Sequence, residues 1–300
     1  MKLTKPKLIK SKLTKPFLLI LIPVTLLLVI SLAKLFPSDL EAMTFQPDYG
    51  PLAKEVVAYL EKQPGTYGLY FIDLRSGQEF GYHQLTAFHA ASTFKLPLNL
   101  YLYREASQDR LNLNEKLFFA PKHLEGGTGI LQRQKTGGRY TIARLSALSI
   151  IYSDNVATNI LLERLGRRQV KNFMRSLGGK RVSDTANITC PFDLALYMRE
   201  TLDFSRSQAV DSKLLLNLLF DSRYKERLPA PLPQGIKVAN KIGTWPPEHT
   251  YNDVAYVVHP ERPYILAVTS RDTPGYNEAL PVIRHLSQMV YDYQTAVAHR

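Results

Sequence analysis

Four consecutive residues, Ser92-Thr93-Phe94-Lys95, place a hydroxyl and an amine three positions apart, directly before an apolar run. On a helix this spacing puts both side chains on one face. A serine hydroxyl is a poor nucleophile until a base takes its proton, and a desolvated lysine amine can be that base. The tetrad therefore predicts a helix over 92–105 that presents a nucleophile beside its base. Because the pattern alone is common, its meaning depends on the rest of the chain.

Two later segments carry the residue types that such a site needs. Ser153-Asp154-Asn155 lies between two helix-like stretches, and Lys241-Ile242-Gly243-Thr244 lies in a strand-like stretch. Serine enzymes that recognise penicillin carry S-x-x-K, S-D-N and K-T-G in this chain order. The chain resembles the class A β-lactamases and their relatives over roughly residues 45 to 295. It departs from the three motifs at Ile242, where the family has threonine or serine.

The order of strand-like and helix-like stretches predicts an α+β fold. Strand patterns gather near the two ends of the chain, and a mainly helical block, 92–228, separates them. We expect an antiparallel sheet formed by both terminal parts, covered by helices, with an inserted all-α lobe. The resemblance implies the same fold. The expected strands are 67–74, 79–82, 236–244, 253–259 and 264–270, and the expected flanking helices are 52–60 and 278–298.

The resemblance implies three catalytic residues. Ser92 would be the nucleophile that forms an acyl-enzyme, and Lys95 would be the base that activates it. Ser153 would pass a proton to the leaving amine, with its hydroxyl bridging Lys95 and Lys241. Asp154 is expected to be structural, because aspartate is a favoured cap at the start of a helix.

The resemblance also implies four substrate-binding residues. Asn155 would hydrogen-bond the acylamide carbonyl of the substrate, and Lys241 would supply positive charge for its carboxylate. Gly243 would let the strand approach the substrate closely. The backbone N–H of Thr244 would pair with that of the nucleophile as an oxyanion hole, which contributes roughly 3 kcal/mol per donor. Ile242 lacks the hydroxyl that helps bind the carboxylate in the family, and the Thr244 side chain is the candidate to replace it.

One part of the family's machinery is missing from the sequence. Class A β-lactamases use a glutamate on a long loop after the S-D-N helix to activate the water that hydrolyses the acyl-enzyme. Here only Lys180 to Ile188 occupies that place, and Asp184 is its sole carboxylate. The sequence therefore supports acylation and leaves the base for deacylation unassigned.

Other motifs are set aside. Lys135-Thr136-Gly137 also spells K-T-G, but it precedes the S-D-N motif and lies in a glycine-rich stretch without a strand pattern, so we interpret it as a loop. The stretch 126–131 is a turn that could border the cleft, and it lacks the Gly-Lys-Ser/Thr of a phosphate loop. The seven histidines show no ligand spacing, so we expect no metal site and no cofactor.

The first fifty residues predict attachment to a membrane. The basic tail 1–16 precedes an apolar segment, 17–36, which reaches the length that can just span a bilayer. We interpret 17–36 as an uncleaved signal anchor, with a cleaved signal peptide as the alternative, and 37–50 as a linker. Residues 51–300 would then be a β-lactamase-like catalytic domain outside the cytoplasm, or a secreted one if the segment is cleaved.

Charge and cysteine content exclude other classes of partner. The formal net charge is +12, but six lysines before residue 16 supply half of it, and no basic stripe interleaved with aromatic residues marks a nucleic-acid surface. Cys190 is the single cysteine, so no intramolecular disulfide can form, and we expect it to be a small buried hydrophobic residue. We expect a monomer.

These observations favour an exported, membrane-anchored serine hydrolase that forms an acyl-enzyme at Ser92 with β-lactams or D-Ala-D-Ala-like peptides. A D,D-peptidase-like cell-wall enzyme is the first alternative. A non-catalytic envelope binding or sensor module that keeps the fold is the second, and Ile242 and the missing loop favour it. The complete set of serines and lysines argues against it, because a pure binder has no need of two such lysines.

Overall fold

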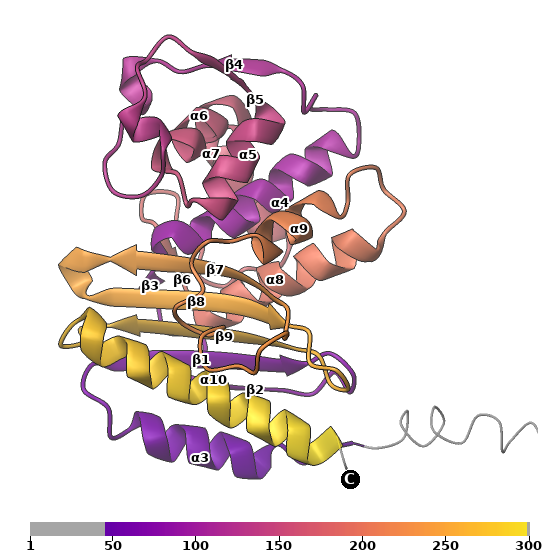
Figure 1. Cartoon of the computed structure of the whole chain (residues 1–300), viewed down its shortest axis with the longest axis vertical. Coiled ribbons are helices and arrows are strands. Elements are labelled where there is room, and N and C mark those ends of the chain that lie inside the picture. Colours follow the sequence, from indigo (N-terminus) through magenta and orange to yellow (C-terminus); the bar gives the residue numbers. More distant parts are fainter. Residues whose placement is uncertain (1–45, 299–300) are drawn as a thin grey trace, which may run out of the picture. The chain divides into compact units, whose positions relative to one another are not determined.

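The computed structural model describes residues 46–298, so the expected basic tail, the signal anchor and most of the linker lie outside the described residues. Residues from Asp48 onward form one compact unit built around a five-stranded antiparallel sheet. The strand order is β2-β1-β9-β8-β7, which brings the N-terminal hairpin beside the three C-terminal strands (Figure 1). The strands are β1 (Thr66–Asp73), β2 (Glu79–Tyr82), β7 (Val238–Trp245), β8 (Thr250–Val257) and β9 (Tyr264–Arg271).

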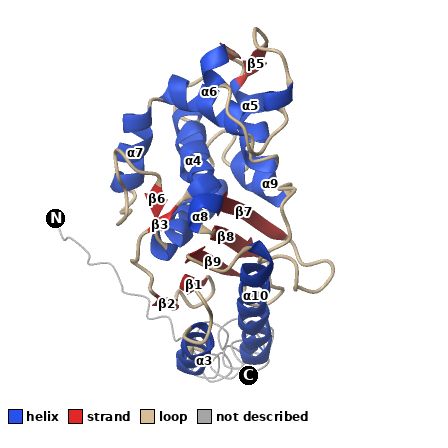
Figure 2. Ribbon diagram, turned by 90° about the vertical axis from the view of Figure 1, so that its left-hand side faces the viewer, coloured by secondary structure: helices blue, strands red, loops and turns tan. Residues whose placement is uncertain are grey.

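Helices cover both faces of this sheet (Figures 1 and 2). Helices α3 (Gly50–Leu60) and α10 (Tyr276–Ala298) contact each other on one face, and α8 (Pro191–Arg206) packs on the other. Successive side chains of a strand point to opposite faces. On β1, accordingly, Leu69 and Phe71 join the cluster under α3 and α10, whereas neighbouring residues join the cluster under α8.

The inserted lobe is helical. Its central helix, α4, contacts α5, α7, α8 and α9. The leucines of α4 are all solvent-inaccessible, and most of the helix is buried. The lobe comprises α4 (Lys95–Ala106), α5 (Ile142–Ile151), α6 (Asn155–Leu165), α7 (Arg167–Ser176) and α9 (Leu214–Phe220), the 3-10 turns η1 (Ala91–Phe94), η2 (Pro121–His123) and η3 (Leu131–Arg133), and the two-stranded pairs β3 (Phe88–His89) with β6 (Ile188–Thr189) and β4 (Lys116–Phe118) with β5 (Arg139–Thr141).

The predicted α+β fold is confirmed. The hairpin, the three C-terminal strands and the two flanking helices lie within a few residues of their expected positions. The Lys135-Thr136-Gly137 segment lies in the loop before β5, as expected, and Cys190 is free and buried. Among residues 46–298, no helix is long and apolar enough to cross a membrane, and the segment expected to do so is outside that range.

The start of the helix that carries Lys95 differs from the prediction. Residues 91–94 form the 3-10 turn η1, and the α-helix begins only at Lys95. The reason is a sharp bend before the turn, where Ala91 adopts a left-handed conformation with φ of 48°. The Thr93 hydroxyl secures the bend by donating to the Ala90 carbonyl oxygen at 2.6 Å. Ser92 therefore sits on a strained turn rather than on the first turn of an α-helix.

Edge strand β7 packs directly against this turn. A Cβ atom added to Gly243 would lie 2.7 Å from the Ala90 carbonyl oxygen and 3.1 Å from a Thr93 methyl carbon. Glycine is therefore required for the contact between the strand and the turn that carries Ser92. The sequence had assigned Gly243 to close approach of the substrate, and the structure shows that the nearest neighbour is the turn.

We predict that Gly243→Ala lowers the free energy of unfolding by about 1–3 kcal/mol, because the added methyl group overlaps a backbone oxygen that cannot rotate away. Chemical denaturation measures the change. Gly126→Ala is the matched control: nothing lies within 4 Å of its added Cβ atom, so a small effect is expected. Equal stabilities of the two variants would show that the turn moves freely away from the strand.

A buried carboxylate fixes the loop that precedes β5 to the start of α6. Asp154 accepts the backbone N–H of Ala157 at 2.9 Å as the N-cap of α6. Its other oxygen accepts the N–H groups of Ile130 and Leu131 at 2.7 and 2.8 Å. The expected structural role of Asp154 thus extends to positioning the 126–131 turn.

We predict that Asp154→Ala lowers the free energy of unfolding by about 2–4 kcal/mol. The substitution removes the N-cap of α6 and leaves buried backbone N–H donors without an acceptor. The control is Thr141→Ala, which removes only the N-cap of α5 and should cost about 1 kcal/mol. Denaturation of both variants compares the two costs. A loss for Asp154→Ala no larger than for the control would contradict the anchoring role.

Candidate active site

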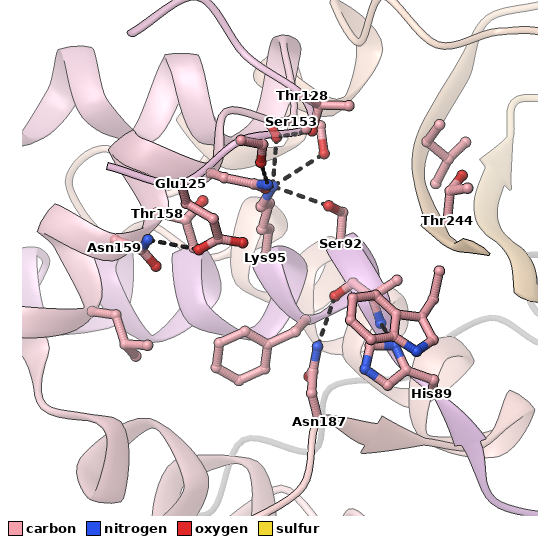
Figure 3. Close-up of a pocket in the computed structure, with 18 of the residues that line it drawn as sticks. His89, Ser92, Lys95, Glu125, Thr128, Ser153, Thr158, Asn159, Asn187 and Thr244 are labelled. Atoms are coloured by element: carbon pink, nitrogen blue, oxygen red, sulfur yellow. Dashed lines mark hydrogen bonds between the residues drawn. The ribbon is translucent and has the colours of Figure 1, made fainter. Parts of the chain in front are cut away.

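The three motifs meet at one cleft. A cavity of about 490 Å³ is lined by Ser92, Lys95, Ser153, Asn155 and Thr244, together with the turn that follows η2 (Figure 3). These residues come from η1 and α4, from the turn before α6, and from β7. The structure therefore brings together the residues predicted as nucleophile, base, proton relay and substrate contacts. Their catalytic and binding roles stay predictions.

The amine of Lys95 is the centre of the arrangement. It lies 3.0 Å from the Ser92 hydroxyl oxygen, 2.7 Å from the Asn155 side-chain oxygen, and also contacts the Ser153 carbonyl and hydroxyl oxygens. A neutral amine donates two hydrogen bonds and can accept one from the Ser92 hydroxyl, as a base requires.

Burial favours that neutral form. Lys95 is 4% exposed, and burial lowers its pKa to about 7, against the opposing charges of Asp154 and Glu125. An amine that titrates near neutral pH is suited to accept a proton from a hydroxyl and to give it up again.

Ser153 joins the two motif lysines. Its hydroxyl lies 2.9 Å from the Lys241 amine and 3.3 Å from the Lys95 amine. Lys241 is fully buried, and this burial lowers the pKa of its amine well below the usual value. The charge of Lys95 is the second cause of the shift. Ser153 has a left-handed φ of 51°, and Thr128 donates a hydrogen bond of 2.7 Å to its carbonyl oxygen. Lys241 does not line the cavity and is linked to it through Ser153.

The Asn155 amide is engaged on both sides. Its oxygen accepts from Lys95, and its nitrogen donates to the Gly126 carbonyl oxygen at 2.8 Å. The same amide that was predicted to bind the substrate therefore also ties the base to the 126–131 turn. A substrate carbonyl has to share the nitrogen with Gly126.

An arginine missed by the sequence analysis supports the end of β7. Arg227 is 1% exposed and donates to the Gly243 carbonyl oxygen at 2.7 Å and to the Thr244 hydroxyl oxygen. Ile242 is buried and lines the cavity with Thr244. No local sequence pattern marks Arg227, because its partners lie elsewhere in the chain.

The short loop after α7 supplies an amide to the cleft and no carboxylate. The Asn187 side chain donates to the Ala91 carbonyl oxygen at 3.2 Å and lines the cavity. Asp184, the sole carboxylate of the loop, is exposed and forms an ion pair with Arg175 at 2.5 Å. It is absent from the cavity lining, so this loop offers no base next to Ser92.

Glu125 is a second residue that the sequence analysis missed. Among the described residues that line the cavity it is the only carboxylate. One of its oxygens accepts a hydrogen bond of 2.7 Å from the Asn159 amide on α6. The sequence did contain a signal for Glu125, because this residue directly precedes the glycine-rich turn that was expected to border the cleft.

Two rings line the cavity at the β7 side. His89 stacks on Trp245, with ring centroids 4.3 Å apart and planes inclined by 14°. Burial lowers the pKa of His89, which favours the neutral ring that stacks on the indole. Within residues 46–298, no group of three or more His, Cys, Asp or Glu residues is arranged to hold a metal ion.

Comparison with curated proteins finds β-lactamases. The chain is 34% identical to β-lactamase SME-1 of Serratia marcescens over 128 residues, which cover 42% of the chain and 43% of that protein. It is 30% identical to the carbapenem-hydrolysing β-lactamase KPC of Klebsiella oxytoca over 243 residues, covering 73% and 81%. The match thus spans less than half of the first of these relatives and most of the second.

Solved structures give the same result. PBP-A superimposes with a TM-score of 0.78 at 27% identity, covering 84% of this chain and all of the other. A mutant of PBP-A, solved as an acyl-enzyme complex with penicillin G, gives a TM-score of 0.76, covering 82% and 97%. The model of the β-lactamase enzyme family matches residues 51–294. The chain therefore belongs to the β-lactamase enzyme family, as a class A β-lactamase-like serine hydrolase within the penicillin-recognising serine enzymes.

Proposed function

We propose that this protein forms an acyl-enzyme at Ser92 with β-lactams or with D-Ala-D-Ala-like amides. The observation that carries the proposal is the 3.0 Å contact between the Ser92 hydroxyl and the buried Lys95 amine, at the floor of an open cleft. A hydroxyl within hydrogen-bond distance of a near-neutral base is an activated nucleophile.

Acylation then follows from the geometry. Neutral Lys95 takes the Ser92 proton as the hydroxyl oxygen bonds to the amide carbonyl carbon. The backbone N–H groups of Ser92 and Thr244 stabilise the oxyanion. As the C–N bond breaks, the Ser153 hydroxyl gives its proton to the leaving nitrogen and recovers one from a lysine amine that it contacts.

The carboxylate of the substrate would bind at the end of β7. Arg227 donates to the oxygen of the Thr244 hydroxyl, which leaves the hydroxyl's own hydrogen free to donate into the cleft. Lys241 would add positive charge in its protonated form, with its amine joined to the cleft through Ser153. Thr244 thus takes the place of the hydroxyl that Ile242 lacks.

The relatives support this substrate class. SME-1 and KPC are named as β-lactamases, and the PBP-A mutant carries a penicillin G acyl group. The absence of a carboxylate in the cavity-lining part of the loop after α7 favours a D,D-peptidase-like activity as the second candidate. For either activity we propose that the apolar segment 17–36 anchors the catalytic unit outside the cytoplasm, and that this unit acts as a monomer.

We predict that intact-mass spectrometry of the protein incubated with penicillin G detects an added mass of one penicillin. Ser92→Ala removes the attacking oxygen and should abolish the adduct. Ser107→Ala, at the far end of α4, is the control and should label like the unchanged protein. Labelling of the Ser92→Ala variant, or none in the unchanged protein with any β-lactam, would refute acylation at this serine.

The pKa of Lys95 gives a second prediction. Since the neutral amine is the base and its pKa is about 7, the rate of adduct formation should rise with pH through neutrality and level off above it. At pH 6 about one tenth of the maximal rate is expected, because about one tenth of the amine is neutral there. The charges of Asp154 and Glu125 oppose the effect of burial on this pKa, so the measurement is a complete rate–pH profile. A flat profile from about pH 5.5 to 8.5 would exclude Lys95 as the base.

A further inference from the structure

Release of the acyl group is the half-reaction that the motifs do not explain. An acyl-serine is an ester, and its hydrolysis at neutral pH is efficient when a positioned base takes a proton from the attacking water. The loop after α7 cannot supply that base from Asp184, which pairs with Arg175 away from the cavity. The base must come from another wall of the cleft.

Glu125 stands on the helical-lobe side of this cavity. One carboxylate oxygen is held by Asn159 at 2.7 Å. Figure 3 shows the other oxygen directed toward the Lys95 amine and the Ser92 hydroxyl, without a dashed contact of its own. A carboxylate with one oxygen fixed and the other facing the nucleophile can accept a proton from a water between them.

The main chain around Glu125 is fixed by α6. Asn155 and Asn159 are four residues apart on that helix, so their amides lie on one face. Asn159 holds the Glu125 carboxylate, and Asn155 holds the next carbonyl, that of Gly126, at 2.8 Å. The turn is therefore attached to the same helix whose first residue contacts Lys95. A base held in this way is pre-organised, although its side chain is exposed.

We propose that Glu125 is the general base that releases the acyl group from Ser92, an inference that rests on the acylation proposed above. Its carboxylate takes a proton from water as the water oxygen bonds to the ester carbonyl carbon. The tetrahedral intermediate collapses with cleavage of the bond between that carbon and the Ser92 oxygen. Glu125 passes this proton to the neutral Lys95 amine, and Lys95 then gives it to the departing oxygen, so water and ester give a carboxylic acid and free Ser92.

The negative charge of Glu125 affects the pKa of the Lys95 amine. This charge opposes the effect of burial on the pKa of Lys95, after the larger effect of Asp154. Asn159 acts through Glu125 and is a positioning residue.

The test separates formation of the adduct from its loss. The unchanged protein, Glu125→Gln, Asn159→Ala and the control Glu115→Gln are mixed with penicillin G, freed of excess penicillin, and followed by intact-mass spectrometry. Glu115 pairs with Arg164 at 2.8 Å on the protein surface and does not line the cavity. We expect Glu125→Gln to form the adduct within about twofold of the normal rate and to lose it about 100-fold more slowly or worse. The control should change neither rate.

Asn159→Ala and one further variant, Glu125→Ala, distinguish a catalytic base from a residue that only supports the structure. Asn159→Ala should slow the loss about tenfold without affecting formation, because the carboxylate remains but is no longer held. Glu125→Ala should regain part of the lost rate when formate is added, since a small carboxylate can occupy the space of the missing one. Added formate should not accelerate the unchanged protein.

Each contrary outcome has one meaning. Equal loss rates for Glu125→Gln and the unchanged protein overturn the inference and leave acylation intact. Slower formation with unchanged loss also overturns it, and shows that Glu125 binds substrate instead. An adduct of the unchanged protein that is never lost overturns it as well. No adduct with any β-lactam refutes the proposed acylation itself, and the inference with it.

Discussion

Burial of the Lys95 amine is the condition on which the rest of the site depends. Helix α4 carries it into the interior of the helical lobe, where leucines of the same helix are inaccessible to solvent. Removing a charged amine from water is costly, so its neutral form is favoured at ordinary pH. Ser92, Ser153 and Asn155 each place an oxygen on this amine, so the S-x-x-K and S-D-N motifs are joined by one buried nitrogen.

The second constraint is the conformation of Ser153. A left-handed backbone at a residue other than glycine costs on the order of 1–3 kcal/mol and persists only where its surroundings hold it. Here Thr128 and Lys95 both bind the Ser153 carbonyl oxygen, so the strained turn is held from two sides. The conformation sets the hydroxyl between two lysine amines. After burial, the charge of Lys95 also lowers the pKa of Lys241, and a hydroxyl between two amines is suited to pass a proton from one to the other.

The sequence predicted the features that depend on local spacing and missed those that depend on the path of a loop. Strand alternation located the sheet, and the three-residue spacing of Ser92 and Lys95 placed both on one site. Glu125 escaped notice because its partner, Asn159, is 34 residues away, and only the folded turn brings them together. The 3-10 turn was also missed, since an alanine such as Ala91 gives no sign that it will adopt a left-handed conformation. Functional sites are where such departures from local rules are expected.

The geometry of a strand explains how the third motif can carry isoleucine at position 242. Residues 242 and 244 are two positions apart on β7, so their side chains share a face, and both line the cavity. A hydroxyl at Thr244 therefore still lies on the cavity side, about 7 Å further along the strand. Arg227 donates to its oxygen, which leaves the hydroxyl's hydrogen free to donate elsewhere. Ile242 forms an apolar wall, and in the proposed function Thr244, backed by a buried guanidinium, would bind the carboxylate. The Arg227–Thr244 contact spans 17 residues, so the motif itself could not reveal it.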